Sequence, residues 1–304
     1  MSVSAVHVLH AVNCGATSYT VLSDATPQAL VEALVEFASG HAEPLFAYVR
    51  SARPEIRFTT QQVGVAFNQF GRFGADLSAG NTDLLYRAVT DLGTRDALAA
   101  TTGIRLRMAN AFGFIESVRA GHRDTASCAV RIVAPYDGVN APIVAAGSIA
   151  VTTAPAAAEF YGLGPVSINA ASVPGVQEMT LELAPDLLMA GDASELYDTL
   201  AAIRTITPVM TLRGLDLARW TTYGLTGTAL TALTAYLRRK DSDGGNVADG
   251  TTTHASITAT KGIILLDQTS GGGNTEAQTA LRLQLRSADD TTASVALNQN
   301  VAIT

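Results

Sequence analysis

The stretch AIRTITPVMTLRG, residues 202–214, repeats the pattern of an earlier stretch, YVRSARPEIRFTT, residues 48–60. Four residue pairs share one spacing of 154 positions: Arg50 and Arg204, Pro54 and Pro208, Ile56 and Met210, and Phe58 and Leu212. Because a basic residue, a proline and two apolar residues recur together, the two stretches are expected to fold alike.

Other parts of the chain repeat in the same order, which favours an internal duplication. The matches are CAVRIV from Cys128 with TALRLQ from Thr279, GFIESVRAG from Gly113 with GIILLDQTSG from Gly262, Tyr86 with Tyr236, and SIAVT (148–152) with NVAIT (300–304). VHV at Val6 and VSI at Val166 match only weakly. The collinear order predicts two copies of one domain, residues 1–152 and 153–304.

A helix is predicted just before Pro208 in the second copy. Asp192 and Glu195 have the spacing of a capping box, and Leu196, Leu200 and Ile203 form an apolar stripe at helical spacing. Pro208 would end the helix, since the residue before a proline is disfavoured in the α region.

The first copy repeats the helical pattern. Pro44 suits a first helical turn, Leu45 and Val49 face one way, and Pro54 ends the segment. An earlier amphipathic stretch, PQALVEALVEFAS, begins at Pro27.

Most of the remaining chain is predicted to be strand. Apolar and polar residues alternate over Ile104–Met108, Glu178–Leu183, Val209–Arg213 and Ala280–Arg286. Strict alternation is typical of antiparallel sheets with one buried face. The predicted fold class is α+β, mostly β, with two tandem β-sandwich domains that each carry a flanking α-helix.

Composition limits the classes of function. Of 304 residues, 47% are hydrophobic and 15% are charged, so disorder is not expected. The net charge of −7 gives no basic footprint for nucleic acid. No apolar run reaches transmembrane length, and the N-terminus has no recognisable signal peptide. Cys14 and Cys128 lie far apart in sequence, so a disulfide framework is not expected.

Several residues could carry chemistry, but their patterns are incomplete. His7 and His10 are three positions apart in a predicted strand, which does not favour a metal pair. GLGPVS, Gly162–Ser167, begins like a dinucleotide fingerprint, but Pro165 and Ser167 break the motif. A turn between the domains is the preferred interpretation.

Two acidic motifs resemble parts of known functional sites. Asp124 in HRDTAS resembles half of an aspartic protease dyad, but its counterpart region, Asn274 and Thr275, has no carboxylate. DSDGGN, Asp241–Asn246, has the wrong register for an EF-hand, so a solvated loop is favoured over a surface calcium site. We therefore predict no enzyme and assign no catalytic, cofactor-binding or metal-binding residue.

The run FYGLGPVSINAASVPGVQEMTLEL from Phe160, followed by TPVMTLRGLDL from Thr207, resembles the tail tube proteins of long-tailed bacteriophages. The resemblance is clearest over Phe160–Tyr223 and weaker over the first copy. It implies β-sandwich domains that form stacked rings around a hollow bore. The duplication is similar to members in which three chains form a pseudo-hexameric ring.

The resemblance also implies partners and a location. Rings would contact one another and other tail proteins, such as a tape measure, a terminator or a baseplate, and DNA would pass through the bore without specific binding. A bore poor in Lys and Arg would hold phosphates weakly. The protein would be made in the bacterial cytoplasm and reside in the virion, with no membrane partner.

The two copies are not electrostatically equivalent. Residues 1–152 carry 11 basic and 12 acidic side chains, whereas residues 153–304 carry 9 and 15. The two copies would therefore alternate around a ring. Two polar loops, Arg238–Thr253 and the predicted hairpin tip Gln268–Asn274, are candidates for contacts between rings.

The sequence is also compatible with two other functions. A baseplate hub or tail terminator would share the fold but occur in few copies per particle. A two-domain hydrolase would require a convergent acid–base pair, which the sequence does not reveal.

Overall fold

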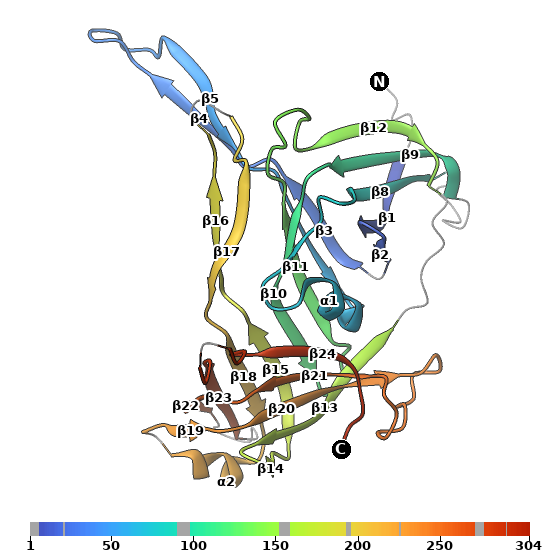
Figure 1. Ribbon diagram of the computed structural model, residues 1–304, viewed down its shortest axis with the longest axis vertical. Coiled ribbons are helices and arrows are strands. Elements are labelled where there is room, and N and C mark those ends of the chain that lie inside the picture. The colour runs from blue at the N-terminus through green and yellow to red at the C-terminus, as the bar shows by residue number, and fades with distance from the viewer. Residues whose placement is uncertain are drawn as a thin grey trace.

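The computed structural model describes residues 6–20, 22–89, 98–151, 159–192, 196–224, 226–270, 277–289 and 291–304. The described chain is mostly β, arranged in several antiparallel sheets (Figure 1). The alternation of apolar and polar residues explains this architecture, because each sheet buries one face and exposes the other. The predicted mostly β character is confirmed.

Two five-stranded sheets, here called A and D, have the same strand order. Sheet A runs β12 (Val144–Ile149), β9 (Leu98–Met108), β8 (Thr82–Val89), β1 (Val6–Cys14) and β2 (Thr17–Tyr19). Sheet D runs β24 (Ala296–Val301), β21 (His254–Ala259), β20 (Leu233–Lys240), β13 (Phe160–Ile168) and β14 (Ala171–Ser172). The described strands of the first half are β1–β12, and those of the second half are β13–β24. Counted from the start of its own half, each sheet has the order twelfth, ninth, eighth, first and second strand.

A ten-stranded sheet, sheet B, runs through the whole molecule. Its order is β19 (Thr228–Leu230), β22 (Gly262–Ser270), β23 (Gln278–Leu285), β18 (Val209–Gly214), β15 (Val176–Glu182), β10 (Phe112–Gly121), β11 (Ser127–Val133), β6 (Glu55–Thr60) and β3 (Leu22–Gln28), with β7 (Ala75–Asp76) beside β10. Each half contributes five strands in equivalent order. The two contributions join where β10 pairs with β15.

Each half also extends a two-stranded hairpin. The first arm, residues 31–52, consists of β4 (Val31–Glu36) and β5 (Phe46–Ala52). The second arm, residues 185–206, consists of β16 (Pro185–Ala190) and β17 (Leu200–Ile206). Equivalent ion pairs span the two hairpins: Arg50 with Glu32 in the first, and Arg204 with Asp186 in the second. A bulge follows Glu32 and Asp186 alike.

The helices predicted before Pro54 and Pro208 are wrong, since both segments are strands of the arms. Leu200 and Ile203 lie in β17. In the first arm, Leu45 lies one residue before β5, and Val49 lies within β5. The amphipathic stretch from Pro27 forms the end of β3 and then β4. Short apolar runs fit both periodicities, and the cross-strand ladders decide between them. Glu195 of the predicted capping box lies outside the described residues.

The helices occur later in each half. Helix α1 (Val63–Phe70) buries Val63, Ala66, Phe67 and Phe70. It packs against β10 of its own half and against β24 of the other half. Its counterpart is a single turn, α2 (Leu217–Trp220), followed by the 3₁₀ turn η1 (Thr221–Tyr223).

The strand registers test the proposed sequence matches. Arg131 lies opposite Arg57 on the neighbouring strand, and Arg282 lies opposite Thr211 in the second half, which supports spacings of 154 and 151. Val144 lies opposite Arg107, and Ala296 opposite Thr258, which agrees with the match between SIAVT and NVAIT. These pairs occupy equivalent places in the two halves.

Three other matches need correction. A bulge separates Ile115 from Ser117 in β10 and Leu266 from Gln268 in β22, so the true spacing there is 151 rather than 149.

Strands β1 and β13 also contain bulges at equivalent places. Leu9 pairs with Tyr86 before a bulge, and Leu163 pairs with Leu237 before a bulge, so Tyr86 corresponds to Leu237 instead of Tyr236. Beyond that bulge, Val166 corresponds to Val12 and not to Val6.

Rare backbone conformations recur at equivalent positions. Leu30 and Ala184, which precede the two arms, have φ of 42° and 43°. Ser148 and Asn300 have φ of 53° and 56°. Residues other than glycine rarely adopt this left-handed region. Its recurrence in both halves shows that the chain path repeats in detail as well as in strand order.

The core joins the two halves. A single cluster of buried residues includes Ile56 and Phe70 from the first half and Tyr161, Trp220 and Leu283 from the second. Leu281, Leu283 and Leu285 all point into this core, as their alternation predicts. The strands predicted at Glu178–Leu183, Val209–Arg213 and Ala280–Arg286 are confirmed to within about two residues at each end. The strand predicted at Ile104–Met108 is the last part of a longer strand, β9, which begins at Leu98.

Candidate assembly interface

The candidate residues for metal or cofactor binding do not lie together at one site. His7 and His10 lie in β1, where His10 falls at the bulge. Within the described part of the chain, no three His, Cys, Asp or Glu side chains are grouped so that they could hold a metal ion.

Gly162–Ser167 lies inside strand β13, so the prediction of a turn between domains is wrong. A Cβ atom on Gly164 would lie 2.8 Å from the carbonyl oxygen of Tyr236, which explains the glycine by close strand packing.

The acidic motifs have structural roles. Asp124 lies in the turn between β10 and β11, where its Oδ1 accepts the N–H of Thr125. The region expected to face it, Asn274 and Thr275, lies outside the described residues. Asp241 Oδ1 accepts the N–H groups of Asp243 at 3.0 Å and Gly245 at 2.7 Å. This carboxylate therefore closes a turn.

The predicted polar loop after Lys240 is anchored at its end by His254. This side chain is fully buried; its Nδ1 accepts the N–H of Arg239 at 3.0 Å, so Nε2 donates to the carbonyl oxygen of Ala248, also at 3.0 Å. The loop is more constrained than its glycine-rich sequence suggests. The second predicted loop does connect a hairpin, β22 and β23, but residues 271–276 at its tip lie outside the described residues.

Both cysteines are free, which agrees with the expectation of no disulfide framework, and both are buried. Burial raises the pKa of both the Cys14 and the Cys128 thiol far above the usual range. Burial likewise raises the pKa of the neighbouring Tyr19 hydroxyl. A thiol must ionise to act as a nucleophile, so neither cysteine is suited to covalent catalysis.

The raised thiol pKa values predict a loss of stability in alkali. Above pH 9, the thiols ionise in the unfolded chain but stay protonated in the folded chain, so unfolding releases protons. The free energy of unfolding should then fall by up to about 2.7 kcal/mol per pH unit from the two thiols together. Urea unfolding at pH 8 and pH 10 measures this slope. The variant with Cys14→Ala and Cys128→Ala should show a shallower dependence; an unchanged slope would contradict this explanation.

The join between β10 and β15 connects the two halves of the chain through backbone hydrogen bonds and through buried apolar side chains. Five residue pairs, from Ser117 opposite Glu182 to Gly121 opposite Glu178, form a regular antiparallel ladder. Val118 and Leu181 face each other in this ladder, and both are fully buried. The strand edge of one half is thus completed by a strand of the other half.

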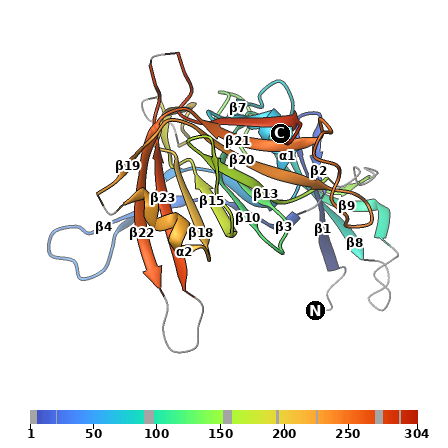
Figure 2. The same cartoon turned by 90° about the horizontal axis from the view of Figure 1, so that it is seen from below.

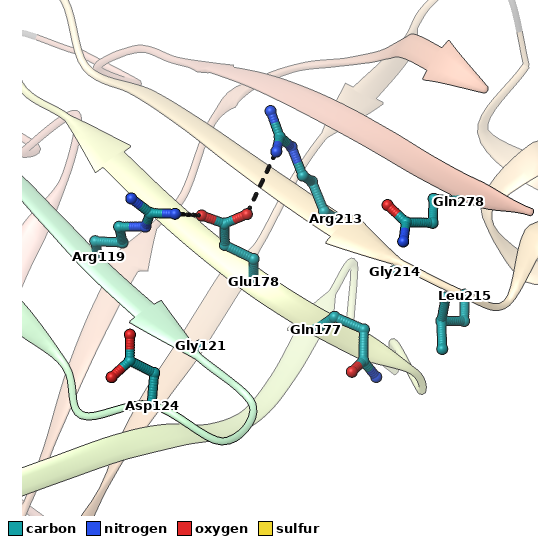
Figure 3. A pocket seen from close by; sticks show the side chains of 9 residues that line it. All are labelled: Arg119, Gly121, Asp124, Gln177, Glu178, Arg213, Gly214, Leu215 and Gln278. Carbon is teal, nitrogen blue, oxygen red and sulfur yellow. Dashed lines mark hydrogen bonds and ion pairs between the residues drawn. The ribbon is translucent and has the colours of Figure 1, made fainter. Parts of the chain in front are cut away.

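An ion-pair cluster lies on the exposed face of this join (Figure 3). The Glu178 carboxylate lies 2.6 Å from an Arg119 nitrogen on β10 and 3.4 Å from an Arg213 nitrogen on β18. Asp124 lines the same shallow cavity, of about 280 Å³, but its carboxylate lies apart from the cluster in Figure 3. Because both arginines are largely exposed, the cluster adds at most about 1 kcal/mol. It is better suited to setting register than to catalysis.

The second arm reaches from its own half onto the first half. Leu196 O accepts the N–H of Ala52 at 2.9 Å, and Asp198 O accepts the N–H of Tyr136 at 2.7 Å. The Asp198 carboxylate lies 2.9 Å from Arg53 Nε. Tyr197 packs on Tyr136 with ring centroids 5.6 Å apart. The two halves are therefore joined twice, by a strand ladder and by a seated arm.

The equivalents of the joined edges lie at the two ends of sheet B. In the described chain, the far edge of β3 has no neighbouring strand, and β22 has only the short β19 beside its beginning. Gln268, Thr269 and Ser270, the counterparts of Ser117, Val118 and Arg119, extend past β19 and are exposed. An unpaired edge is a template for another strand.

Sequence reasoning did not reveal this candidate interface. The strand edges depend on pairings between distant segments, and the predicted helices concealed the arms. The stretch VEALVE, Val31–Glu36, does not alternate strictly, and its apolar residues do not decide between a strand and a helix.

Comparisons with known proteins give no further guide to function. A scan against protein-family models and a search of curated proteins found no match to this chain. Among the described helices, none combines the length and the apolar character needed to cross a membrane.

Proposed function

We propose that this protein is a structural, non-enzymatic component of a phage-like tail tube. In this proposal, residues 1–152 and 153–304 are tandem tail-tube-like β-sandwich domains, and three chains form a pseudo-hexameric ring. The single observation that carries the proposal is the ladder between β10 and β15, because the equivalent edges, that of β22 past the short β19 and the far edge of β3, have no neighbouring strand in the described chain.

The equivalence of the edges gives the proposed contact between chains a definite register. Ser117 faces Glu182 and Arg119 faces Thr180 within the chain. By the spacings of 151 and 154, Gln268 would face Gln28 of a second chain, and Ser270 would face its Thr26. Such a head-to-tail contact produces a ring when the rotation closes. The number of three chains rests on the resemblance to duplicated tail tube proteins.

The exposed face of sheet B is the proposed lining of the bore. This face carries several arginines, which differs from the expectation of a bore poor in basic residues. Four of them are engaged by two carboxylates: Arg57 and Arg131 by Glu55, and Arg119 and Arg213 by Glu178. Arginines that are already paired with carboxylates neutralise fewer phosphates, so fewer counterions are released from a passing polyphosphate. Together with the net charge of −7, this pairing supports passage of DNA without retention.

Further partners follow from the same proposal. Rings would stack into a tube, for which the loop after Lys240 and the hairpin tip after Ser270 remain candidate contacts. The tube would also meet other tail proteins in the virion. The ordered turns at Asp241 and His254 support a loop that can present a defined surface.

Native mass spectrometry of the purified protein tests this function. We expect the mass of three chains, with tubes accumulating at higher concentration in negatively stained images. A protein that stays monomeric at all concentrations, or that turns over substrates in a hydrolase screen, would contradict the proposal.

A further inference from the structure

The two arms are equivalent hairpins in unequal surroundings. Each has a nine-residue connection between strands of six and seven residues. The first arm has seven large apolar side chains that are 47–63% exposed: Val31, Val35, Phe37, Leu45, Phe46, Tyr48 and Val49. In the described part of the second arm, only Leu200 belongs to this class, at 50% exposed.

The difference follows from what the arms touch. Figures 1 and 2 both show the first arm projecting beyond the body of the molecule, whereas Figure 1 shows the second arm ending at the base of the first. One side of the second arm faces Glu55, Arg131 and Val133 of the first half across a cavity. A projecting arm with exposed aromatic side chains is typical of a surface that another protein covers.

The seat of the second arm has a counterpart in the second half. The seat is formed by Ala52 and Arg53, at the end of β5, and by Tyr136, three residues after β11. The spacings of 154 and 151 place Ile206, Thr207 and Ser287 at the equivalent positions.

The counterpart seat is open where the original is covered. Ala52 is 6% exposed beneath the second arm. Ile206 is only partly buried, and Thr207 and Ser287 are exposed. Within the described chain, the backbone contacts that seat Leu196 and Asp198 have no equivalent there.

We propose that the first arm of one chain docks on the Ile206–Ser287 seat of a second copy of this chain. This inference rests on the proposed ring, in which the second half of one chain lies next to the first half of another. Ala42, Glu43 and Pro44 of the arm take the places of Leu196, Tyr197 and Asp198. Backbone contact from Ile206 to Ala42 then repeats the bond from Ala52 to Leu196.

The chemistry of the contact between chains differs from that of the contact within a chain. Glu43 and Ser287 cannot repeat the ring contact of Tyr197 with Tyr136, and Pro44 and Thr207 cannot repeat the ion pair of Asp198 with Arg53. The exposed apolar side chains of the first arm, led by Phe46 and Tyr48, provide the attraction instead. Burial of such side chains is the main favourable contribution to association.

Disulfide trapping tests the docking geometry. Ala52 and Tyr197 form a parallel strand bridge within the chain, a geometry that brings two Cα atoms within the range that a disulfide spans. The equivalent pair between chains is Ile206 with Glu43. The variant carrying Glu43→Cys and Ile206→Cys should form covalent trimers under oxidising conditions, seen on a non-reducing gel. The native cysteines are buried and give little background.

Two controls complete the test. The variant carrying Ala52→Cys and Tyr197→Cys should give a disulfide within the monomer and no covalent oligomer. Mixing a chain with Glu43→Cys alone and a chain with Ile206→Cys alone should give covalent dimers that contain one of each, so a failure of the double variant to fold would not decide the matter.

The outcomes separate this inference from the proposed function. Rings that form without any cross-link between positions 43 and 206 would overturn the docking inference and leave the ring intact. Cross-linked open chains without closed rings would support the docking inference and contradict the proposed ring.

Discussion

A chain carrying Thr26→Asp and Ser270→Asp is expected to remain monomeric under conditions in which the wild type is expected to form the proposed rings. Both residues are exposed in the single chain, so the substitutions should leave the monomer folded. In the proposed contact between β22 and β3, Ser270 of one chain faces Thr26 of the next. Two aspartates would then stand directly opposite each other, which is destabilising.

The magnitude follows from Coulomb's law. Two charges about 5 Å apart in water interact by about 0.8 kcal/mol. Relative to the neutral Ser–Thr pair of the wild type, three repulsive contacts therefore weaken a ring by about 2.5 kcal/mol. Relative to an attractive aspartate–lysine pair, as in the matched control, they weaken it by about 5 kcal/mol. That difference corresponds to more than about 1,000-fold in the assembly constant. High salt should weaken the effect.

The matched control reverses one charge. Thr26→Asp combined with Ser270→Lys should assemble at least as well as the wild type, because the lysine resembles Arg119 at the equivalent position of the internal ladder. Sedimentation velocity at low ionic strength compares the two double variants. Equal assembly of both would show that these positions do not face each other.

The second large effect concerns the stability of the fold. Trp220→Ala should lower the free energy of unfolding by about 4 kcal/mol. The Trp220 side chain is fully buried in α2 and belongs to the core cluster that joins the halves. A Cβ atom on Gly214 would overlap the Trp220 ring and would lie 2.8 Å from the carbonyl oxygen of Gly175. Because backbone atoms form part of the pocket around Trp220, the cavity that Trp220→Ala would leave cannot collapse readily.

Urea unfolding of the variant gives the measurement. Leu215→Ala is a suitable control, since Leu215 lies nearby but is 38% exposed, and it should cost less than about 1 kcal/mol. A loss at Trp220 no larger than that at Leu215 would mean that the second half does not depend on this contact. Trp220→Phe should give an intermediate loss.

The repeat could be predicted because several of its markers are local. Pro54 and Pro208 directly precede equivalent strands, β6 and β18, and Arg131 and Arg282 occupy equivalent places in β11 and β23. The predicted spacing was off by one or two residues in strands that carry β-bulges, as at Glu116 and Asp267, where the alternation of side chains is interrupted in both halves. A bulge changes which side chains share a face without leaving a clear mark in the sequence.

Helix assignment failed for a different reason. The arms contain apolar residues at spacings that fit either a helix or a strand, and prolines that can end both. The true helix, Val63–Phe70, has no side-chain cap at Gln62 and contains a glycine. Its position is decided by tertiary packing on β10 and β24, which no local pattern reports.

The candidate interface was beyond prediction from sequence. Its edges exist because β10 pairs with β15 and because, in the described chain, the far edge of β3 and the edge of β22 past β19 have no neighbouring strand. All of these relations involve distant residues. The exposure of Phe46 and Tyr48 likewise depends on where the arm projects. In contrast, the lack of a disulfide could be anticipated from two cysteines far apart in sequence.

Cryo-electron microscopy of the assembled protein tests the central claim most directly. The account predicts a closed ring in which sheet B continues from chain to chain, with β22 of each chain antiparallel to β3 of the next and Ser270 opposite Thr26. A ring whose β3 and β22 edges face solvent, or an assembly held together only through other surfaces, would contradict it.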